Sequence, residues 1–182
     1  RCLKYGFLTS ICMDFSVFQK RVPFSQKKNA VFIPPFDHID VVIGQGTVGL
    51  EIMKELPDVD NIVVAIGGGG LAAGVAVAAK LSAKANGRKV KVYGVQSEHA
   101  APYVPSMKSG KLTEVVTTPT IADGIAVSKP GRIPFELIKK HVDKVVTVSE
   151  NEIAKAILVL LERAKQVVEP AGAVGVAALI AG

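Results

Sequence analysis

The stretch from Asn61 to Gly74 constrains this chain more than any other, because an apolar, β-branched run leads directly into four consecutive glycines, Gly67 to Gly70. The apolar run is short, which suits a strand buried on both faces. The residues from Leu71 to Lys84 are good helix formers. We therefore predict a strand, a glycine turn and a helix. Such a turn can hold an anion, because glycines permit close approach to the main chain and the first amides of a helix point outward.

Two other interpretations of this stretch stay open at this point. Residues 62–79 contain no charged side chain and are just long enough for a transmembrane helix, although four glycines in the middle disfavour a continuous helix. The glycines could also form a plain structural turn without a ligand. A phosphate or carboxylate site is the interpretation that we favour.

Length and charge exclude several classes of protein. The chain has 182 residues and 49% apolar content, which indicates a globular domain with a real core. Its net charge is +6, but residues 1–30 carry +5 of it, so the remaining chain is nearly neutral. A neutral body with few aromatic residues predicts no nucleic-acid partner.

The first 30 residues differ in composition from the rest. They contain both cysteines, Cys2 and Cys12, and half of the ten aromatic residues. Two cysteines make no disulfide framework, so a reducing compartment is acceptable and we expect a cytoplasmic protein. The chain begins with Arg1, and we expect it to be processed, engineered or a fragment. The three histidines lie far apart without metal-ligand spacing, which predicts no metal site.

The remaining chain alternates between strand and helix patterns. We leave residues 1–30 unassigned, and we predict a buried strand at residues 30–33, ended by Pro34 and Pro35, and an amphipathic helix at residues 41–56 with Val48, Ile52 and Leu56 on its apolar face. The helix contains Gly44-Gln-Gly46-Thr-Val-Gly49, which matches the G-x-G-x-x-G pattern of dinucleotide sites. That pattern needs a preceding strand and an acid after the next strand, and here the next strand ends in glycines. We therefore do not favour a dinucleotide site.

Further elements follow the glycine turn. We predict strands at residues 89–97 and 144–148, and helices at residues 71–84, 135–141 and 173–181. Ser149 and Glu152 form a capping box for a helix with Ile153, Ile157, Leu160, Leu161, Ala164 and Val168 on one face. Residues 31–182 thus predict an α/β protein with a mostly parallel, three-layer arrangement, whose ligands bind at the carboxyl ends of the strands.

Few residues outside the glycine turn suggest chemistry. A Walker loop is excluded, because Val75 and Ala76 stand where lysine and serine or threonine are needed. The chain has no G-x-S-x-G or H-E-x-x-H motif. Asp123-Gly124, within the segment 120–127, suits a loop that passes a ligand, and Glu169 lies at a helix break. These features fit a phosphate-bearing cofactor.

Several segments resemble the serine/threonine dehydratase family, in order and with the family's spacing. They are Ile33-Pro-Pro-Phe-Asp37, Gly44-Gln-Gly-Thr-Val-Gly-Leu-Glu51, Gly67-Gly-Gly-Gly-Leu-Ala-Ala-Gly74, Gly94-Val-Gln-Ser-Glu98, Thr120-Ile-Ala-Asp-Gly-Ile-Ala-Val127, Val146-Thr-Val-Ser-Glu150 and Val168-Glu-Pro-Ala-Gly-Ala173. Within that family the chain looks most like the threonine dehydratases. The family comprises pyridoxal-phosphate enzymes of the tryptophan-synthase β type, fold type II, and includes serine racemases. The resemblance implies that the G-Q-G-T motif lies in a helical connection.

The resemblance implies deamination of L-threonine, and usually of L-serine, to a 2-oxo acid and ammonia, with pyridoxal 5'-phosphate as cofactor. Carried over by motif, Gly67, Gly68, Gly69, Gly70 and Leu71 would bind the cofactor phosphate through backbone amides. Gly124 would lie beside the cofactor, and Glu169 near its pyridine ring. The resemblance also suggests a homo-oligomer, which we expect to form through apolar surface.

The chain departs from the family in several places. The family's Schiff-base lysine, in an S-F-K-type motif, precedes anything that this chain contains, and the S-G-G-N segment would follow Gly182. The short serine-lysine patterns at Lys27, Lys108 and Lys129 do not match the position of that lysine. Family members with a divalent-cation site use acids where this chain has Gln96 and Pro102, so we predict no such site. We therefore expect the phosphate-binding half of a site without the catalytic lysine.

Overall fold

A computed structural model of the protein describes residues 32–182. Its helices and strands are, in chain order, α2 (Ile39–Glu55), β1 (Asn61–Ala65), α3 (Gly70–Ala85), β2 (Lys91–Ser97), α4 (Tyr103–Ser109), η1 (Asp123–Ile125), α5 (Arg132–His141), β3 (Lys144–Val148), α6 (Glu150–Val159), η2 (Leu160–Ala164) and α7 (Pro170–Ala181). The unassigned segment 1–30 lies outside the described residues, so the domain boundary placed there stays a prediction.

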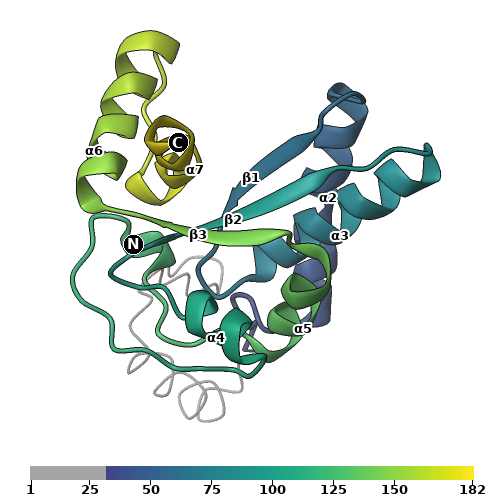
Figure 1. The fold of residues 1–182 in the computed structure, drawn as a ribbon, viewed down its shortest axis with the longest axis horizontal. Helices are drawn as coiled ribbons and strands as arrows, with labels where there is room; N and C mark the ends of the chain where they lie inside the picture. The colour runs from purple at the N-terminus through teal and green to yellow at the C-terminus, as the bar shows by residue number, and fades with distance from the viewer. Residues whose placement is uncertain (1–31) are drawn as a thin grey trace, which may run out of the picture.

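Three parallel strands form a sheet in the order β1-β2-β3 (Figure 1). Val64 of β1 pairs with Gly94 of β2, and Val95 of β2 pairs with Val146 of β3. Helices α2, α3 and α5 lie on one side of the sheet, and α6 and α7 lie on the other (Figure 1). The predicted fold class, α/β with a parallel sheet in three layers, is confirmed.

Each face of the sheet has its own hydrophobic core, because successive side chains of a strand point to opposite faces. In β1, Ile62 and Val64 are buried against the α2, α3 and α5 side. Val63 and Ala65 of the same strand pack against the α6 and α7 side. The prediction that this run is a strand buried on both faces is therefore confirmed.

The transmembrane interpretation of residues 62–79 does not describe the structure, because β1 and α3 divide that run between a strand and a helix. Within the part of the chain that the structure describes, no helix is long and apolar enough to span a bilayer.

The G-x-G-x-x-G segment lies inside α2, where it lets α2 pack closely on α3. Gly46, Gly49, Val42 and Met53 are the buried residues of α2. A Cβ on Gly49 would lie 2.7 Å from the Val75 carbonyl oxygen of α3. The predicted apolar face was wrong in part, because Val48 and Leu56 are 41% and 60% exposed. Apolar spacing misplaced the face because the contact is made by glycines, which carry no apolar side chain to count.

The predicted strand at residues 30–33 is also wrong where the structure describes it. Phe32 and Ile33 belong to no strand, and Ile33 is 67% exposed. Two prolines follow at once, and they cannot donate the ladder hydrogen bonds that a strand requires. Residues 30 and 31 lie outside the described part.

The helix opened by Ser149 is shorter than predicted. Its capping box is present, with the Ser149 side chain accepting a hydrogen bond from the Glu152 amide. The α-helical part ends at Val159, and a π-helical turn, η2, follows as far as Ala164, with Lys165, whose φ is 57°, as its C-cap residue. Ile153 is buried, whereas Leu161 and Ala164 are exposed and Val168 packs from the following loop. A single helical face therefore does not extend past Leu160.

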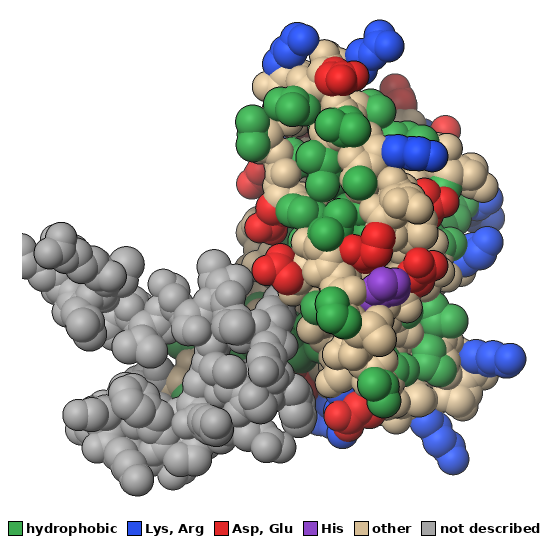
Figure 2. All heavy atoms as spheres, turned by 90° about the vertical axis from the view of Figure 1, so that its left-hand side faces the viewer, with side chains coloured by type: hydrophobic (Ala, Val, Ile, Leu, Met, Phe, Trp, Pro, Cys, Tyr) green, Lys and Arg blue, Asp and Glu red, His purple; other side chains and the backbone are tan. Residues whose placement is uncertain are grey.

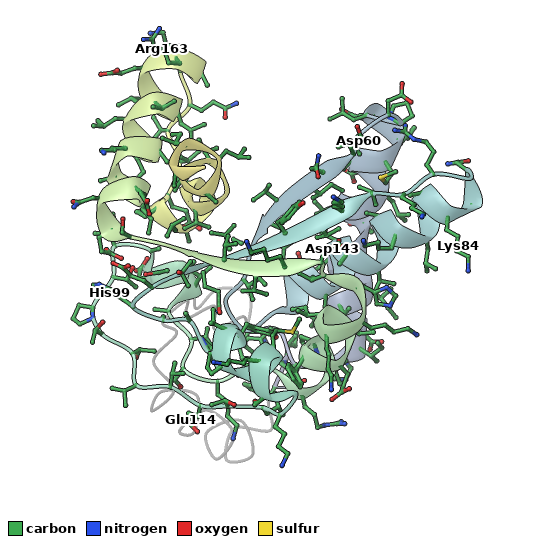
Figure 3. The ribbon with its side chains drawn as sticks, viewed as in Figure 1. Asp60, Lys84, His99, Glu114, Asp143 and Arg163 are labelled. Atoms are coloured by element: carbon green, nitrogen blue, oxygen red, sulfur yellow. The ribbon has the colours of Figure 1, made fainter. Side chains whose placement is uncertain are left out.

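Other boundaries shift by two or three residues. Helix α5 begins at Arg132 and α7 at Pro170, because proline fits the first turn of a helix. Strand β2 begins at Lys91, where the Val92 amide donates to the Asp143 carboxylate at 2.7 Å. Lys80 of α3 pairs with the same oxygen at 2.6 Å, so Asp143, labelled in Figure 3, ties the sheet to the helical layer.

The surface over α6 carries exposed apolar side chains between charged ones (Figure 2). Leu158, Val159 and Leu161 are all at least 40% exposed. The homo-oligomer expected from the sequence stays a prediction.

Candidate active site

The glycine turn joins the carboxyl end of β1 to the first turn of α3. Gly69 is the N-cap residue of α3, with φ 102° and ψ −4°, a backbone conformation that side chains disfavour. A Cβ on Gly69 would overlap the Tyr103 hydroxyl and would lie 2.9 Å from Pro134 Cβ. The residue at this position must therefore be glycine, both for its backbone and for its packing.

The backbone amides of this turn are available to an anion. Among residues 32–182, no acceptor receives a hydrogen bond from the amides of Gly67 to Ala72, and the first helical bond runs from the Ala73 amide to the Gly69 carbonyl. These amides lie at the positive end of the α3 dipole. A helix start of this kind suits phosphate.

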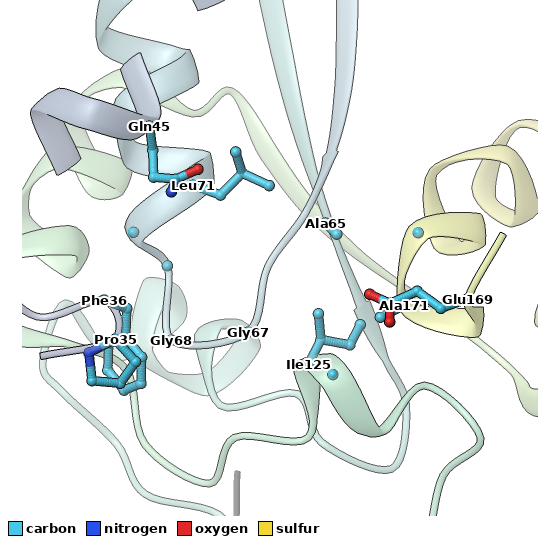
Figure 4. Close-up of a pocket in the computed structure, with 14 residues that line it drawn as sticks. Pro35, Phe36, Gln45, Ala65, Gly67, Gly68, Leu71, Ile125, Glu169 and Ala171 are labelled. Carbon is cyan, nitrogen blue, oxygen red and sulfur yellow. The ribbon is translucent and has the colours of Figure 1, made fainter. Parts of the chain in front are cut away.

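The turn opens onto a cavity of about 310 Å³ (Figure 4). All seven residues for which the sequence suggested a cofactor contact line it, namely Gly67, Gly68, Gly69, Gly70, Leu71, Gly124 and Glu169. The other lining residues are Pro35, Phe36, Gln45, Ala65, Ile125, Ala171 and Gly172. The structure thus brings together three segments that are far apart in sequence, although their contact with a cofactor stays a prediction.

Glu169 faces the glycine turn across the cavity (Figure 4). It is the N-cap residue of α7, and its carbonyl accepts a hydrogen bond from the Gly172 amide at 2.9 Å. Its carboxylate has no hydrogen-bond partner among the described residues. A Cβ on Gly124 would lie 3.6 Å from Glu169 Oε1 and 3.0 Å from Ala171 Cβ. The glycine at position 124 therefore leaves room for a ligand next to the carboxylate.

The loop that carries Gly124 is fastened by Glu150, the first residue of α6. The Glu150 carboxylate accepts hydrogen bonds from the Ser97 hydroxyl at 3.1 Å, the Thr120 hydroxyl at 2.5 Å and the Ile121 amide at 2.7 Å. Burial raises the pKa of this carboxyl, but those hydrogen bonds and the nearby His99 together lower it by more, so the pKa lies below its ordinary value of 4.5. The ionised form of Glu150 therefore holds the site loop against β2.

Replacing Glu150 with glutamine should destabilise the fold at neutral pH by about 1 to 2 kcal/mol, because the amide offers one accepting oxygen where the carboxylate offers two, and its hydrogen bonds lack the negative charge. The folded-state pKa is lowered, so the carboxylate contributes stability above about pH 4.5 that is lost as the pH falls below it. The melting temperature should therefore fall less steeply between pH 7 and pH 3 in Glu150→Gln than in the parent chain. Equal slopes would show that Glu150 does not supply this acid sensitivity.

Phe36 and Gln45 line the cavity as well, although no sequence pattern marked them as site residues. A Cβ on Gly68 would overlap the Phe36 ring, so this ring packs directly on the turn. Gln45 reaches the rim of the cavity from α2 (Figure 4). Both belong to segments that carried the family resemblance, which was the available signal.

Among the described residues, neither a lysine nor a group of metal ligands lines this cavity. No lining residue is a lysine. Lys129 instead forms an ion pair, with its Nζ 3.9 Å from Glu114 Oε2. Gln96 is fully buried, and its amide is engaged by backbone groups. Within residues 32–182 no three acidic, histidine or cysteine side chains gather as a metal site. The absence of a divalent-cation site stays a prediction.

Comparisons with known proteins show which family the chain belongs to. The model of the pyridoxal-phosphate dependent enzyme family matches residues 19–182. The chain is 52% identical over 163 residues to an L-threonine ammonia-lyase of Thermotoga maritima, covering 90% of this chain and 40% of that protein. It is similar in structure to the T.th. threonine deaminase, with TM-score 0.83, 33% identity, and coverage of 89% of this chain and 55% of that one.

Maize serine racemase is also similar in structure, with TM-score 0.80, 34% identity, and coverage of 90% of this chain and 49% of that one. The chain therefore spans about half, or less, of the length of the proteins it matches. A family match over most of the chain, on a fold whose glycine turn presents free amides to a cavity, leaves one assignment: the chain belongs to the pyridoxal-phosphate dependent enzymes.

Proposed function

We propose that this chain carries the phosphate-binding half of the active site of a threonine dehydratase, which deaminates L-threonine, and L-serine as well, to 2-oxobutanoate or pyruvate and ammonia. The observation that carries the proposal is the cavity in which Gly67 to Gly70, Gly124 and Glu169 meet. The similarity to an L-threonine ammonia-lyase at 52% identity supports the choice of reaction. The cytoplasmic location expected from the sequence stays a prediction.

The residues of the cavity fit pyridoxal 5'-phosphate. Bound there, the cofactor would supply the electron-accepting ring that stabilises the carbanion left when the substrate loses its α-proton. The amides of Gly67 to Leu71 would donate to its phosphate, because they lie unpartnered at a helix start. Gly124 would leave space for the ring, and Glu169 would place a carboxylate beside it. The ring and the phosphate would thus be held from opposite walls.

The 182-residue chain should bind the phosphate group without catalysing the reaction. Pyridoxine 5'-phosphate has no aldehyde and cannot react with surface lysines, so calorimetric titration with it reports on the cradle alone. We expect saturable binding that pyridoxine, which lacks the phosphate, does not show. Addition of pyridoxal 5'-phosphate and L-threonine should give no 2-oxobutanoate, because no lysine lines the described cavity.

Two results would contradict this proposal. Equal affinity for pyridoxine and its phosphate would show that the turn is not an anion site. Turnover, together with borohydride trapping of the cofactor on one lysine of this chain, would show that the catalytic lysine is present after all.

Serine racemisation is the second candidate reaction, favoured by the similarity to maize serine racemase. In a longer protein that includes this chain, L-serine would then yield D-serine in addition to pyruvate. Chiral analysis of the products separates the two reactions. A protein that binds the phosphate but forms neither product in its longer form would instead be a non-catalytic binding module.

A further inference from the structure

Two buried polar side chains lie behind the glycine turn and bind its carbonyl groups. Gln96 of β2 is fully buried, and its Nε2 donates a hydrogen bond to the Ile66 carbonyl at 3.2 Å. Tyr103 of α4 is fully buried as well, and its hydroxyl donates to the Gly68 carbonyl at 3.0 Å. The two residues are joined to each other, because the Tyr103 amide donates to Gln96 Oε1 at 2.9 Å. Neither of them lines the cavity.

These hydrogen bonds fix the orientation of alternate peptides in the turn. In a trans peptide the carbonyl of one residue and the amide of the next point in opposite directions. The peptides of the described chain are all trans. Holding the Ile66 carbonyl therefore orients the Gly67 amide, and holding the Gly68 carbonyl orients the Gly69 amide. The Gly131 amide donates to the Gly68 carbonyl too, at 3.0 Å, so that both lone pairs of this oxygen are used.

We propose that Gln96 and Tyr103, here called the carbonyl clamp, are positioning residues that aim the Gly67 and Gly69 amides into the cavity before any phosphate arrives. The proposal rests on the proposed function, since it concerns the same phosphate cradle. Donors that are oriented in advance cost little reorganisation when the anion binds. The clamp therefore contributes to affinity without touching the ligand.

The two side chains are chemically suited to this task. Gln96 must donate to Ile66 and accept from Tyr103 at the same time, and a neutral amide can do both whereas a carboxylate can only accept. Tyr103 must remain protonated in order to donate. Burial raises the pKa of its phenol, and the nearby charge of Asp37 raises it further. Its ring lies against Phe135, with centroids 6.3 Å apart, so the hydroxyl is held in place by packing.

The first test is Tyr103→Phe in the full 182-residue chain. The ring and its packing stay, and only the donor to Gly68 is lost. Affinity for pyridoxine 5'-phosphate should fall about five-fold, the usual worth of one neutral hydrogen bond. The carbonyl ¹³C resonance of Gly68 should move upfield in the ligand-free protein, because it loses a hydrogen-bond donor. A loss of general stability alone would not produce that local shift.

Tyr93→Phe is the matched control. Tyr93 lies on the same strand as Gln96, and its hydroxyl has no hydrogen-bond partner among the described residues. Affinity for pyridoxine 5'-phosphate and the Gly68 carbonyl resonance should both stay at their parental values in this variant.

The second test is Gln96→Glu, which serves even if Tyr103→Phe does not fold. At pH 8 the new carboxylate should repel the Ile66 carbonyl and weaken binding. When it is protonated at lower pH, the carboxyl can donate to that carbonyl as the amide does. The ratio of the variant's dissociation constant to the parent's, measured at each pH, should therefore fall toward one between pH 8 and pH 5. The phosphate of the ligand titrates equally in both measurements, so its contribution cancels in the ratio.

The outcomes separate the clamp from the site that it serves. If the parent chain binds pyridoxine 5'-phosphate no better than pyridoxine, the proposed function fails and the clamp fails with it. If the parent chain binds the phosphate, but Tyr103→Phe binds equally well or Gln96→Glu shows a ratio that does not change with pH, the clamp is overturned and the cradle stands. A five-fold loss in Tyr103→Phe that the control Tyr93→Phe does not show, together with the Gly68 shift, supports the clamp.

Discussion

Replacing Gly69 with alanine should abolish tight phosphate binding and destabilise the fold by about 3 kcal/mol. Two costs add at this position. The φ of 102° lies in a region that is unfavourable for any residue with a Cβ, and the new methyl group would overlap the buried Tyr103 hydroxyl. Displacing that hydroxyl would also release the Gly68 carbonyl. We expect affinity for pyridoxine 5'-phosphate to fall about 30-fold or more, since hydrogen bonds to a charged group are each worth about 1.5 to 3 kcal/mol.

Gly87→Ala is the control that separates these two costs. Gly87 also has a positive φ, 68°, but a Cβ there would have nothing within 4 Å. Urea unfolding should show a loss of only about 1 kcal/mol, and phosphate affinity should not change. If Gly69→Ala were no more destabilising than Gly87→Ala, the close packing of Tyr103 on the turn would be refuted.

Gly74→Ala should destabilise the protein by about 2 kcal/mol or more, although alanine is the better helix former. Gly74 lies in α3, where α2 crosses it. A Cβ would overlap the Val42 carbonyl and lie 2.6 Å from the Gly46 amide nitrogen. Both atoms belong to the backbone of α2, so no side chain can rotate away and the two helices must separate. Urea unfolding followed by circular dichroism measures the loss.

Gly44→Ala, in helix α2, should change the stability in the opposite direction. Gly44 lies in α2, and a Cβ there would have nothing within 4 Å. Alanine should therefore stabilise the protein by about 0.5 to 1 kcal/mol. Two glycine-to-alanine changes in packed helices would then shift stability in opposite directions. A gain in stability for Gly74→Ala would show that the helices are less closely packed than described.

The sequence predicted the centre of the site because its features are local. A buried strand, a glycine turn and a helix start are each encoded within a few residues, and the stretch from Asn61 to Gly74 contains all three. Local patterns also marked Gly124 in a loop and Glu169 at a helix break, but their place beside a cofactor came from the family resemblance, since nothing local brings a loop and a helix break to one cavity. The structure does so through the sheet, which places both segments at the carboxyl end of β1.

The parts that sequence reasoning missed depend on contacts between distant residues. The buried face of α2 is made of glycines, whose importance comes from Gly74 and Val75 on α3. Phe36 follows two prolines in an irregular segment, and only its packing on Gly68 makes it part of the site. The π-helical turn after Val159 has no local sequence signal that we recognise. Periodicity describes one helix or strand at a time, whereas the glycine face of α2 and the packing of Phe36 each depend on contact with a second segment.

The two hydrophobic cores on opposite faces of the sheet have a consequence for how the protein moves. Ala72 and Ala73, just after the glycine turn, belong to one core, whereas Ile125 and Ala171 belong to the other. A ligand in the cavity would therefore touch segments anchored in both. Its binding energy would therefore stabilise the contact between two separately packed halves of the chain. Local opening of either half would then release the ligand. A chain with the cavity occupied should also unfold more cooperatively than one with the cavity empty.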